Sequence, residues 1–275
     1  MNTQYLRTEN GAIAYDDTGS GRLVICAPSL GDVRAEYRFL TPQLTAAGYR
    51  TVTMDLRGLG ESSTGWADYS VAGVGADLVA LVRHLAAGPA VIVGTSMAAG
   101  AAVWAAAEAP AAVAGLTLIG PFVRGETSPA NALLYKVLFA RPWGVAAWNR
   151  YYDTLYPSKK PADFAAYRAA LRANLSEPGR LAVLQAMLQA SKTAAASRLD
   201  RVSAPTQVIM GTKDPDFKDP KAEAQWVAEQ LHAELTMIDG AGHYPHAEMP
   251  AITGATILSF LAEHHPLLTV NHVQP

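Results

Sequence analysis

Three residues have the types and sequence contexts that nucleophilic catalysis requires. Ser96 lies in VIVGTSMAAG, directly after an apolar run that predicts a strand and directly before an Ala-rich run that predicts a helix. A strained turn from strand to helix exposes a serine hydroxyl, and small residues on either side, here Gly94 and Ala98, let the neighbouring backbones approach. A serine that only caps the helix is the alternative interpretation.

Candidates for an acid and a base follow Ser96 in the chain order Ser, Asp, His. Asp214 lies in MGTKDPDF, after the apolar run TQVIMG, and Asp216 is the nearby alternative. His243 follows Gly-Ala-Gly in IDGAGHYPH, and His246 is a weaker candidate. Solvated loop residues without a catalytic role are the other interpretation. We expect His243 to take the Ser96 proton and Asp214 to orient the imidazole.

Other chemistry finds less support in the sequence. No histidine pair is spaced with carboxylates as in a zinc site, so neither a metal nor another cofactor is expected. Cys26 is the single cysteine and cannot form an internal disulfide, which fits a reducing compartment. Because it lies in the apolar run LVIC, we expect Cys26 to be a buried strand residue rather than a nucleophile.

The elements that must position these residues follow an α/β pattern. Short runs rich in Val and Ile alternate with segments of helical period, which is typical of parallel strands joined by helices. The start differs, because QYLRT and AIAYDD, separated by a turn at Asn10-Gly11, predict an antiparallel hairpin. Helices are expected over residues 34–47, 71–87, 96–110, 221–232 and 251–263.

The alternation stops between residues 121 and 203, which predicts an inserted unit. Helices are expected there over residues 131–139, 143–155 and 162–175, with a fourth around residues 181–188. The predicted organisation is a core of residues 1–120 and 204–275 with a helical cap of residues 121–203. The cap is rich in aromatic residues, which favours an apolar substrate; these are Phe139, Trp143, Trp148, Tyr151, Tyr152 and Tyr156.

The serine turn, the acid loop and the histidine loop together resemble the α/β-hydrolase superfamily, close to its cap-bearing esterase and haloperoxidase-like branch with a serine nucleophile. The resemblance covers nearly the full length. It implies a mostly parallel central sheet with helices on both faces and a helical cap insertion. The segment DLRGLGESS, residues 55–63, resembles a loop of this family that we expect to act as scaffolding.

The chain departs from the family pattern at the first oxyanion loop. The family usually carries His-Gly after its central strand, whereas this chain reads APSLGD, with Pro28 and Ser29 in those places. Carried over by position, the two oxyanion N–H groups belong to Leu30 and Met97. Because a backbone donor does not depend on its own side chain, the oxyanion hole can survive the change, while Ser29 or Asp32 would contact the substrate instead.

Composition limits the partners. The chain has 275 residues, half of them hydrophobic, and a formal net charge of -2. It therefore has no basic field for nucleic acid. The sequence has no uninterrupted run of about 18 apolar residues, the length needed to span a membrane. The first ten residues lack the features of a secretion signal. We expect a cytoplasmic protein with a small-molecule substrate and without nucleic-acid or membrane partners. The oligomeric state is left open.

The sequence predicts a serine hydrolase that cleaves an ester or related acyl bond through an acyl-enzyme. Epoxide hydrolysis and dehalogenation need an aspartate at the turn, so Ser96 argues against both. Three alternatives use the same triad: hydrolysis of a carbon-carbon bond, perhydrolysis, and thioester hydrolysis. A fourth is a ligand sensor with slow turnover, because fold alone does not determine function.

Overall fold

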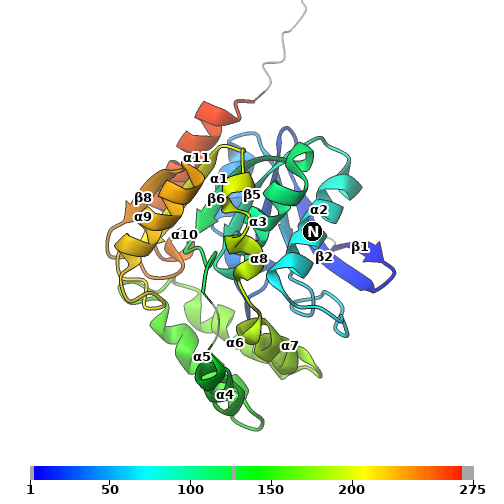
Figure 1. The fold of residues 1–275 in the computed structure, drawn as a ribbon, viewed down its shortest axis with the longest axis vertical. Helices are drawn as coiled ribbons and strands as arrows, with labels where there is room; N and C mark the ends of the chain where they lie inside the picture. The colour runs from blue at the N-terminus through cyan, green and yellow to red at the C-terminus, as the bar shows by residue number, and fades with distance from the viewer. Residues whose placement is uncertain (1–2, 126–127, 268–275) are drawn as a thin grey trace, which may run out of the picture.

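The computed structural model describes residues 3–125 and 128–267. Its centre is an eight-stranded sheet with the order β1-β2-β4-β3-β5-β6-β7-β8 (Figure 1). The first three strands in this order are antiparallel, and the others are parallel. The strands are β1 (Gln4–Thr8), β2 (Gly11–Thr18), β3 (Leu23–Ala27), β4 (Arg50–Met54), β5 (Ala90–Thr95), β6 (Val113–Ile119), β7 (Thr206–Gly211) and β8 (Glu234–Ile238). The predicted mostly parallel sheet is confirmed.

Helices cover both faces of the sheet. On one face lie α2 (Val71–Leu85), α3 (Met97–Glu108) and α9 (Pro220–Leu231), and on the other lie α1 (Leu40–Ala46) and α11 (Pro250–His264). Every residue of β3 is buried, because alternate side chains enter the two cores. Cys26 is one of them, as expected. No helix in the described ranges is long and apolar enough to cross a membrane.

Local expectations differ from the structure at two places. The helix expected over residues 34–47 is divided into a 3₁₀ turn, η1 (Arg34–Tyr37), and α1. Pro42 explains the division, because its ring excludes a helical carbonyl four residues earlier and it has no N–H to donate. In the hairpin, Thr8 pairs with Gly11, so the turn consists of Glu9 and Asn10 rather than Asn10-Gly11.

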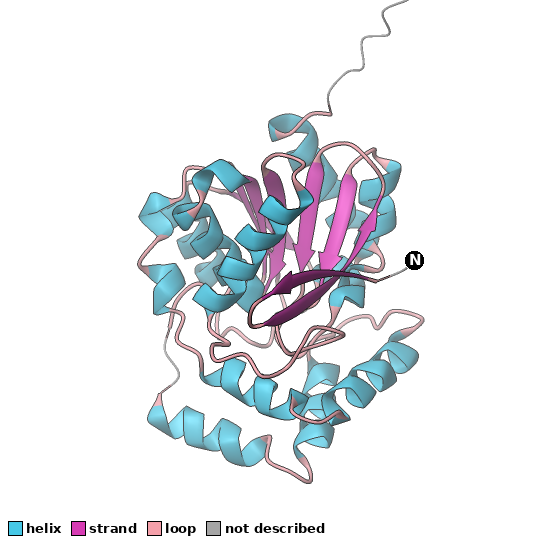
Figure 2. Cartoon of the chain, turned by 90° about the vertical axis from the view of Figure 1, so that its right-hand side faces the viewer, coloured by secondary structure: helices cyan, strands magenta, loops and turns pink. Residues whose placement is uncertain are grey.

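Four of the helices between β6 and β7 in sequence form a separate layer beyond the carboxyl ends of the parallel strands (Figure 2). They are α4 (Pro129–Leu138), α5 (Gly144–Thr154), α6 (Phe164–Ser176) and α7 (Arg180–Gln189), and we call them the helical layer. Their number and approximate positions agree with the sequence prediction. The short helix α8 (Thr193–Ala196) packs against α3 instead, beside the sheet.

The loop after β4, which carries DLRGLGESS, holds the helical layer by its backbone. Asn174 of α6 accepts a hydrogen bond from the Gly60 N–H (3.1 Å) and donates one to the Gly60 carbonyl (2.9 Å). Arg180 of α7 donates to the carbonyls of Gly58 and Ser62. The loop, which we expected to act as scaffolding, therefore docks α6 and α7.

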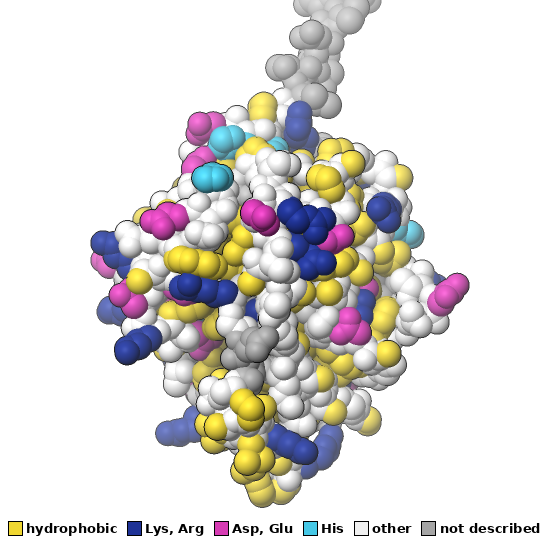
Figure 3. Space-filling view, in the orientation of Figure 1, with side chains coloured by type: hydrophobic (Ala, Val, Ile, Leu, Met, Phe, Trp, Pro, Cys, Tyr) yellow, Lys and Arg dark blue, Asp and Glu magenta, His cyan; other side chains and the backbone are white. Residues whose placement is uncertain are grey.

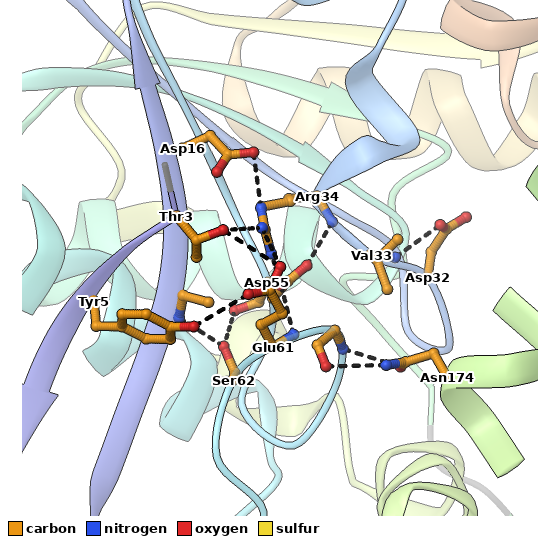
Figure 4. Close-up of polar contacts among 12 residues, drawn as sticks. Thr3, Tyr5, Asp16, Asp32, Val33, Arg34, Asp55, Glu61, Ser62 and Asn174 are labelled. Carbon is orange, nitrogen blue, oxygen red and sulfur yellow. Dashed lines mark hydrogen bonds and ion pairs between the residues drawn. The ribbon is translucent and has the colours of Figure 1, made fainter. Parts of the chain in front are cut away.

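A buried carboxylate keeps the same loop in shape (Figure 4). Asp55 is fully buried and accepts hydrogen bonds from the backbone N–H groups of Arg34 (2.7 Å) and Glu61 (2.9 Å). The Arg34 guanidinium contacts Asp55 and also pairs with Asp16 and Glu61. Burial raises the pKa of Asp55, against the opposing effect of the Arg34 charge. The guanidinium therefore compensates a charge that water does not reach.

Arg34→Met should lower the free energy of unfolding by about 3–5 kcal/mol, because it leaves the Asp55 carboxylate buried without its cation. Urea unfolding measures the loss. Arg50→Met is the matched control, since Arg50 pairs with Asp17 where both side chains are partly exposed to water, and it should cost less than about 1 kcal/mol. Equal losses in the two variants would contradict the assigned role of Arg34.

Candidate active site

Ser96 occupies the turn between β5 and α3. Its backbone is left-handed, with φ 60° and ψ -119°, a conformation that non-glycine residues rarely adopt. The Ser96 N–H donates to the Ile119 carbonyl at 2.8 Å, which fixes the turn to β6. A Cβ at Gly94 would lie 2.6 Å from the Ala98 carbonyl oxygen, so the turn requires glycine at this position. The predicted strand-turn-helix context of Ser96 is present.

His243 lies between two carboxylates. Its Nδ1 is 2.7 Å from Asp214 Oδ2, and its Nε2 is 3.7 Å from Asp216 Oδ2. The Tyr151 hydroxyl of α5 donates to Asp216, whereas Nε2 has no hydrogen-bond partner among the described residues. Asp214 thus has the geometry of an orienting acid, and Asp216 faces the nitrogen that would exchange a proton with Ser96.

Glu248 anchors the loop that carries His243, although the sequence analysis did not single this residue out. This buried carboxylate accepts hydrogen bonds from the N–H groups of Gly242 (2.6 Å) and Ser158 (2.8 Å). The His243 N–H donates to the Leu155 carbonyl at the end of α5 (3.0 Å). The histidine loop and the helical layer are therefore positioned together.

The pKa of His243 is set by opposing effects. Complete burial lowers it, but the negative charges of Asp214 and then Asp216 raise it more, to a net value of about 9. Burial also raises the pKa of Asp216. The two carboxylates therefore favour the protonated form of the imidazole.

Two backbone donors lie on the cavity of Ser96, one on the loop after β3 and one at the start of α3. The N–H groups of Leu30 and Met97 find no acceptor in the described part of the chain, and both residues line the same cavity as Ser96. The Ser29 N–H is already used, because it donates to Oε2 of the buried Glu36 at 2.7 Å. The N–H groups of Leu30 and Met97 therefore remain unused by the described part of the chain.

Asp32 does not contact the cavity, which corrects the expectation that it touches substrate. It is fully buried and accepts hydrogen bonds from the hydroxyls of Tyr152 (2.7 Å) and Tyr167, which belong to α5 and α6. Burial first, and the neighbouring Glu36 second, raise the pKa of Asp32 to about 7. Asp32 thus connects the loop after β3 to the helical layer.

His246 is also remote from the candidate chemistry. It is buried in the short helix α10 (Pro245–Glu248), stacks on Tyr37 and lies 3.1 Å from Glu36 Oε1. Burial lowers the pKa of His246 to about 3, which favours the neutral ring. It does not line the cavity that contains Ser96 and His243.

A cavity of about 170 Å³ lies between the sheet and the helical layer. Its walls come from both, and besides His243 they include one carboxyl group, that of Asp216, and one amine, that of Lys192. Burial lowers the pKa of Lys192. The lining residues are Ser29, Leu30, Ser96, Met97, Phe122, Tyr135, Trp148, Tyr151, Leu155, Leu188, Lys192, Asp216, His243 and Tyr244.

Asp214, Asp216 and His243 are close enough to be considered as metal ligands, since one ligand atom from each lies within 4.8 Å of the others. Asp214 already hydrogen-bonds to Nδ1 of His243, and Asp216 already accepts a hydrogen bond from Tyr151. Both Asp214 oxygens are used, by His243 Nδ1 and the Asp216 N–H, so of these three side chains only His243 Nε2 and Asp216 Oδ2 are left without a hydrogen bond in the described chain, fewer than the three or four ligands of a usual zinc site. The donor set fits proton transfer better than metal binding.

Comparison with known proteins assigns the fold. The family model described as alpha/beta hydrolase fold matches residues 22–250, a span that includes Ser96, Asp214 and His243. The chain belongs to this family. The resemblance noted in the sequence and the class of hydrolase are thereby confirmed.

Individual relatives of this α/β-hydrolase carry different names. A Mycobacterium tuberculosis protein named as a candidate non-heme bromoperoxidase, BpoC, is 29% identical over 264 residues, or 91% of this chain and 97% of the relative. The 2-(acetamidomethylene)succinate hydrolase of Mesorhizobium japonicum is 28% identical over 269 residues, or 93% and 94%. A bromoperoxidase structure from Bacillus anthracis superposes with a TM-score of 0.82 at 20% identity, covering 94% of this chain and 99% of the other.

NMR titration of the imidazole should give His243 a pKa near 9 in the ligand-free protein, and Asp216→Asn should lower it by removing one negative charge. Because this value exceeds the ordinary one of about 6.5, protonated His243 stabilises the fold fully below pH of about 6.5. That contribution is lost as pH rises through about 9. A His243→Gln variant identifies the signal. A wild-type pKa of about 6.5 or below would contradict the two-carboxylate arrangement.

Proposed function

We propose that this α/β-hydrolase is a serine hydrolase that cleaves an ester or related acyl bond of a small, largely apolar substrate. The observation that carries the proposal is the position of Ser96 and His243 on one cavity, with Asp214 bound to the far nitrogen of the imidazole. This is the arrangement of roles in a serine triad.

In the proposed reaction, His243 Nε2 takes the proton of the Ser96 hydroxyl as its oxygen attacks the acyl carbon. Asp214 holds the proton on Nδ1 and stabilises the imidazolium that forms. The imidazolium then protonates the leaving group, and water attacks the acyl-enzyme by the same route. Since only neutral His243 accepts the proton, kcat/KM should rise with pH toward the pKa of about 9.

The oxyanion of each tetrahedral intermediate would be bound by Leu30 and Met97. Both N–H groups lack a protein acceptor in the described ranges, and the α3 helix begins at Met97 with its positive dipole end toward the cavity. Each donor should contribute about 3 kcal/mol of transition-state stabilisation. Glu36 supports this loop from behind through the Ser29 N–H.

The cavity suggests the size of the group that reacts. A volume of about 170 Å³ resembles that of an engineered cavity of ~150 Å³ that binds benzene. We therefore propose a short acyl chain or a single ring as the bound group. Residues 121–203 would act as the cap of a core formed by 1–120 and 204–275, since α4, α5 and α7 supply the walls opposite Ser96.

Perhydrolysis is a second candidate, favoured by the bromoperoxidase names of two similar proteins. Hydrogen peroxide would replace water as the nucleophile that attacks the acyl-enzyme, and the product would be a peracid. Assays of ester hydrolysis with and without peroxide separate the two. Peracid formation at a rate above that of hydrolysis would favour this candidate.

Ser96→Ala and His243→Ala should each lower kcat by at least about 10⁴-fold on an aryl ester, because the triad acts as a unit. Asp214→Asn should cost about as much. Asp216→Asn is the matched control and should cost far less, since Asp216 does not contact Nδ1. Steady-state kinetics decide, and a larger loss in Asp216→Asn would transfer the role of acid to that residue.

In a series of p-nitrophenyl esters, each added methylene should raise kcat/KM by up to about fourfold, equivalent to about 0.8 kcal/mol, until the cavity is full. Leu188→Ala should move the optimum to a longer chain, because Leu188 lines the cavity. Leu133→Ala is the control, since Leu133 faces solvent on α4. An optimum that stays unchanged in Leu188→Ala would place the acyl chain elsewhere.

A further inference from the structure

The helix α4 exposes a set of large apolar side chains. Four residues on its outer side, Leu133, Leu134, Val137 and Leu138, have exposed fractions of 64%, 56%, 56% and 43%, and Trp143 just beyond the helix has 53%. We call these five residues the α4 apolar surface. They make up most of the exposed large hydrophobic residues in the described chain. Such a concentration in one place marks an interaction site more often than scattered single residues do.

The α4 apolar surface is not the side by which the helix packs. Tyr135 and Phe139 point inward, where Phe139 is buried and Tyr135 packs against the core, and α7 contacts the helix on this side. Gln185 of α7 also donates to the Phe139 carbonyl. The helix therefore has apolar side chains on both its inner and outer sides, whereas a helix that faces water normally carries polar residues outward.

The charged residues that flank the α4 apolar surface in the sequence are basic. Lys136 on α4 and Arg141 just beyond it are exposed, and the sequence has no Asp or Glu from residue 127 to residue 152. Within the described chain, neither of these two cations has a carboxylate within 4.0 Å. Figure 3 shows yellow side chains at the lower tip of the molecule, where α4 lies, with blue Lys and Arg side chains on both sides.

We propose that the α4 apolar surface binds a membrane surface that contains anionic lipids. Leu and Trp side chains on one face, together with basic flanks, are the features by which a helix lies in the interface of a bilayer. A second copy of the chain fits less well, because pairing two such surfaces would bring their cations together. The sequence analysis expected no membrane partner because the chain lacks a spanning segment, but a helix that lies on the surface needs none.

This binding goes beyond the proposed function and connects with it through one helix. Tyr135 of α4 lines the cavity that contains Ser96, while its neighbour Leu134 faces outward. A bilayer in contact with the outer face would lie one helix diameter from the cavity. Apolar esters concentrate in lipid, so the docked protein would meet its substrate where it is most abundant.

Flotation with vesicles tests the proposal on the intact chain. The protein should float with vesicles of phosphatidylcholine mixed with phosphatidylglycerol, and much less with phosphatidylcholine alone. Leu134→Glu combined with Val137→Glu should lower the partition coefficient at least about tenfold, since each lost apolar side chain accounts for about that factor. Ile252→Glu is the matched control, because Ile252 is also 56% exposed but lies on α11. Thermal unfolding checks that each variant is folded.

Three further measurements separate the charges from the apolar contact. Lys136→Gln combined with Arg141→Gln should lower binding to the anionic vesicles by about tenfold or more, because each cation near an anionic surface is worth about fivefold. Binding should also weaken as salt is added. Trp143 fluorescence should shift to the blue on binding, and the shift should be absent in Trp143→Phe.

The proposal is overturned if the wild-type protein stays with the soluble fraction at low salt. Sedimentation velocity then shows what covers the surface. A dimer that Leu134→Glu with Val137→Glu dissociates, and that Ile252→Glu does not, would assign the surface to a second copy. Equal flotation of the wild type and of the two-glutamate variant would equally reject it. None of these outcomes depends on ester hydrolysis, so they leave the proposed function to its own tests.

Discussion

A carboxyl group buried away from water must find hydrogen-bond donors, and this requirement shapes the loops at the carboxyl edge of the sheet. Backbone N–H groups supply many of the donors. Glu36 binds the loop after β3, Asp55 the loop after β4, Asp214 the loop after β7, and Glu248 the loop after β8. Because each carboxylate fixes the backbone of its loop, the groups around Ser96 are positioned before any substrate arrives.

Much of this architecture could be predicted from sequence because its signals are local. The strand before Ser96, the helix after it and the small residues beside it are adjacent in the chain, and the order of Ser96, Asp214 and His243 is visible without a fold. The choice between Asp214 and Asp216 was different. The two residues are two positions apart on one loop, and only the distance of each carboxylate from the imidazole nitrogens separates them.

Long-range pairings were beyond the reach of sequence patterns. Glu36 and Glu248 have unremarkable neighbours in the chain, and their importance depends on N–H groups that the fold brings to them. Periodicity predicted the helix α4. Its apolar residues occupy both sides, however, and a sequence pattern cannot tell which side a neighbouring helix will cover. The position of α7 decides this by packing on the side of Tyr135 and Phe139. By contrast, the break at Pro42 follows from a local rule and could have been foreseen.

The contacts between the helical layer and the loop after β4 have an evolutionary consequence. Asn174 and Arg180 bind main-chain atoms of Gly60, Gly58 and Ser62, not loop side chains. Main-chain atoms are the same whatever residue is present, so substitutions at exposed loop positions leave these contacts intact, whereas Gly58 and Gly60 themselves have positive φ and require glycine. A lineage could therefore exchange or redesign the layer above Ser96, and with it the substrate range, while the core beneath keeps the same docking points.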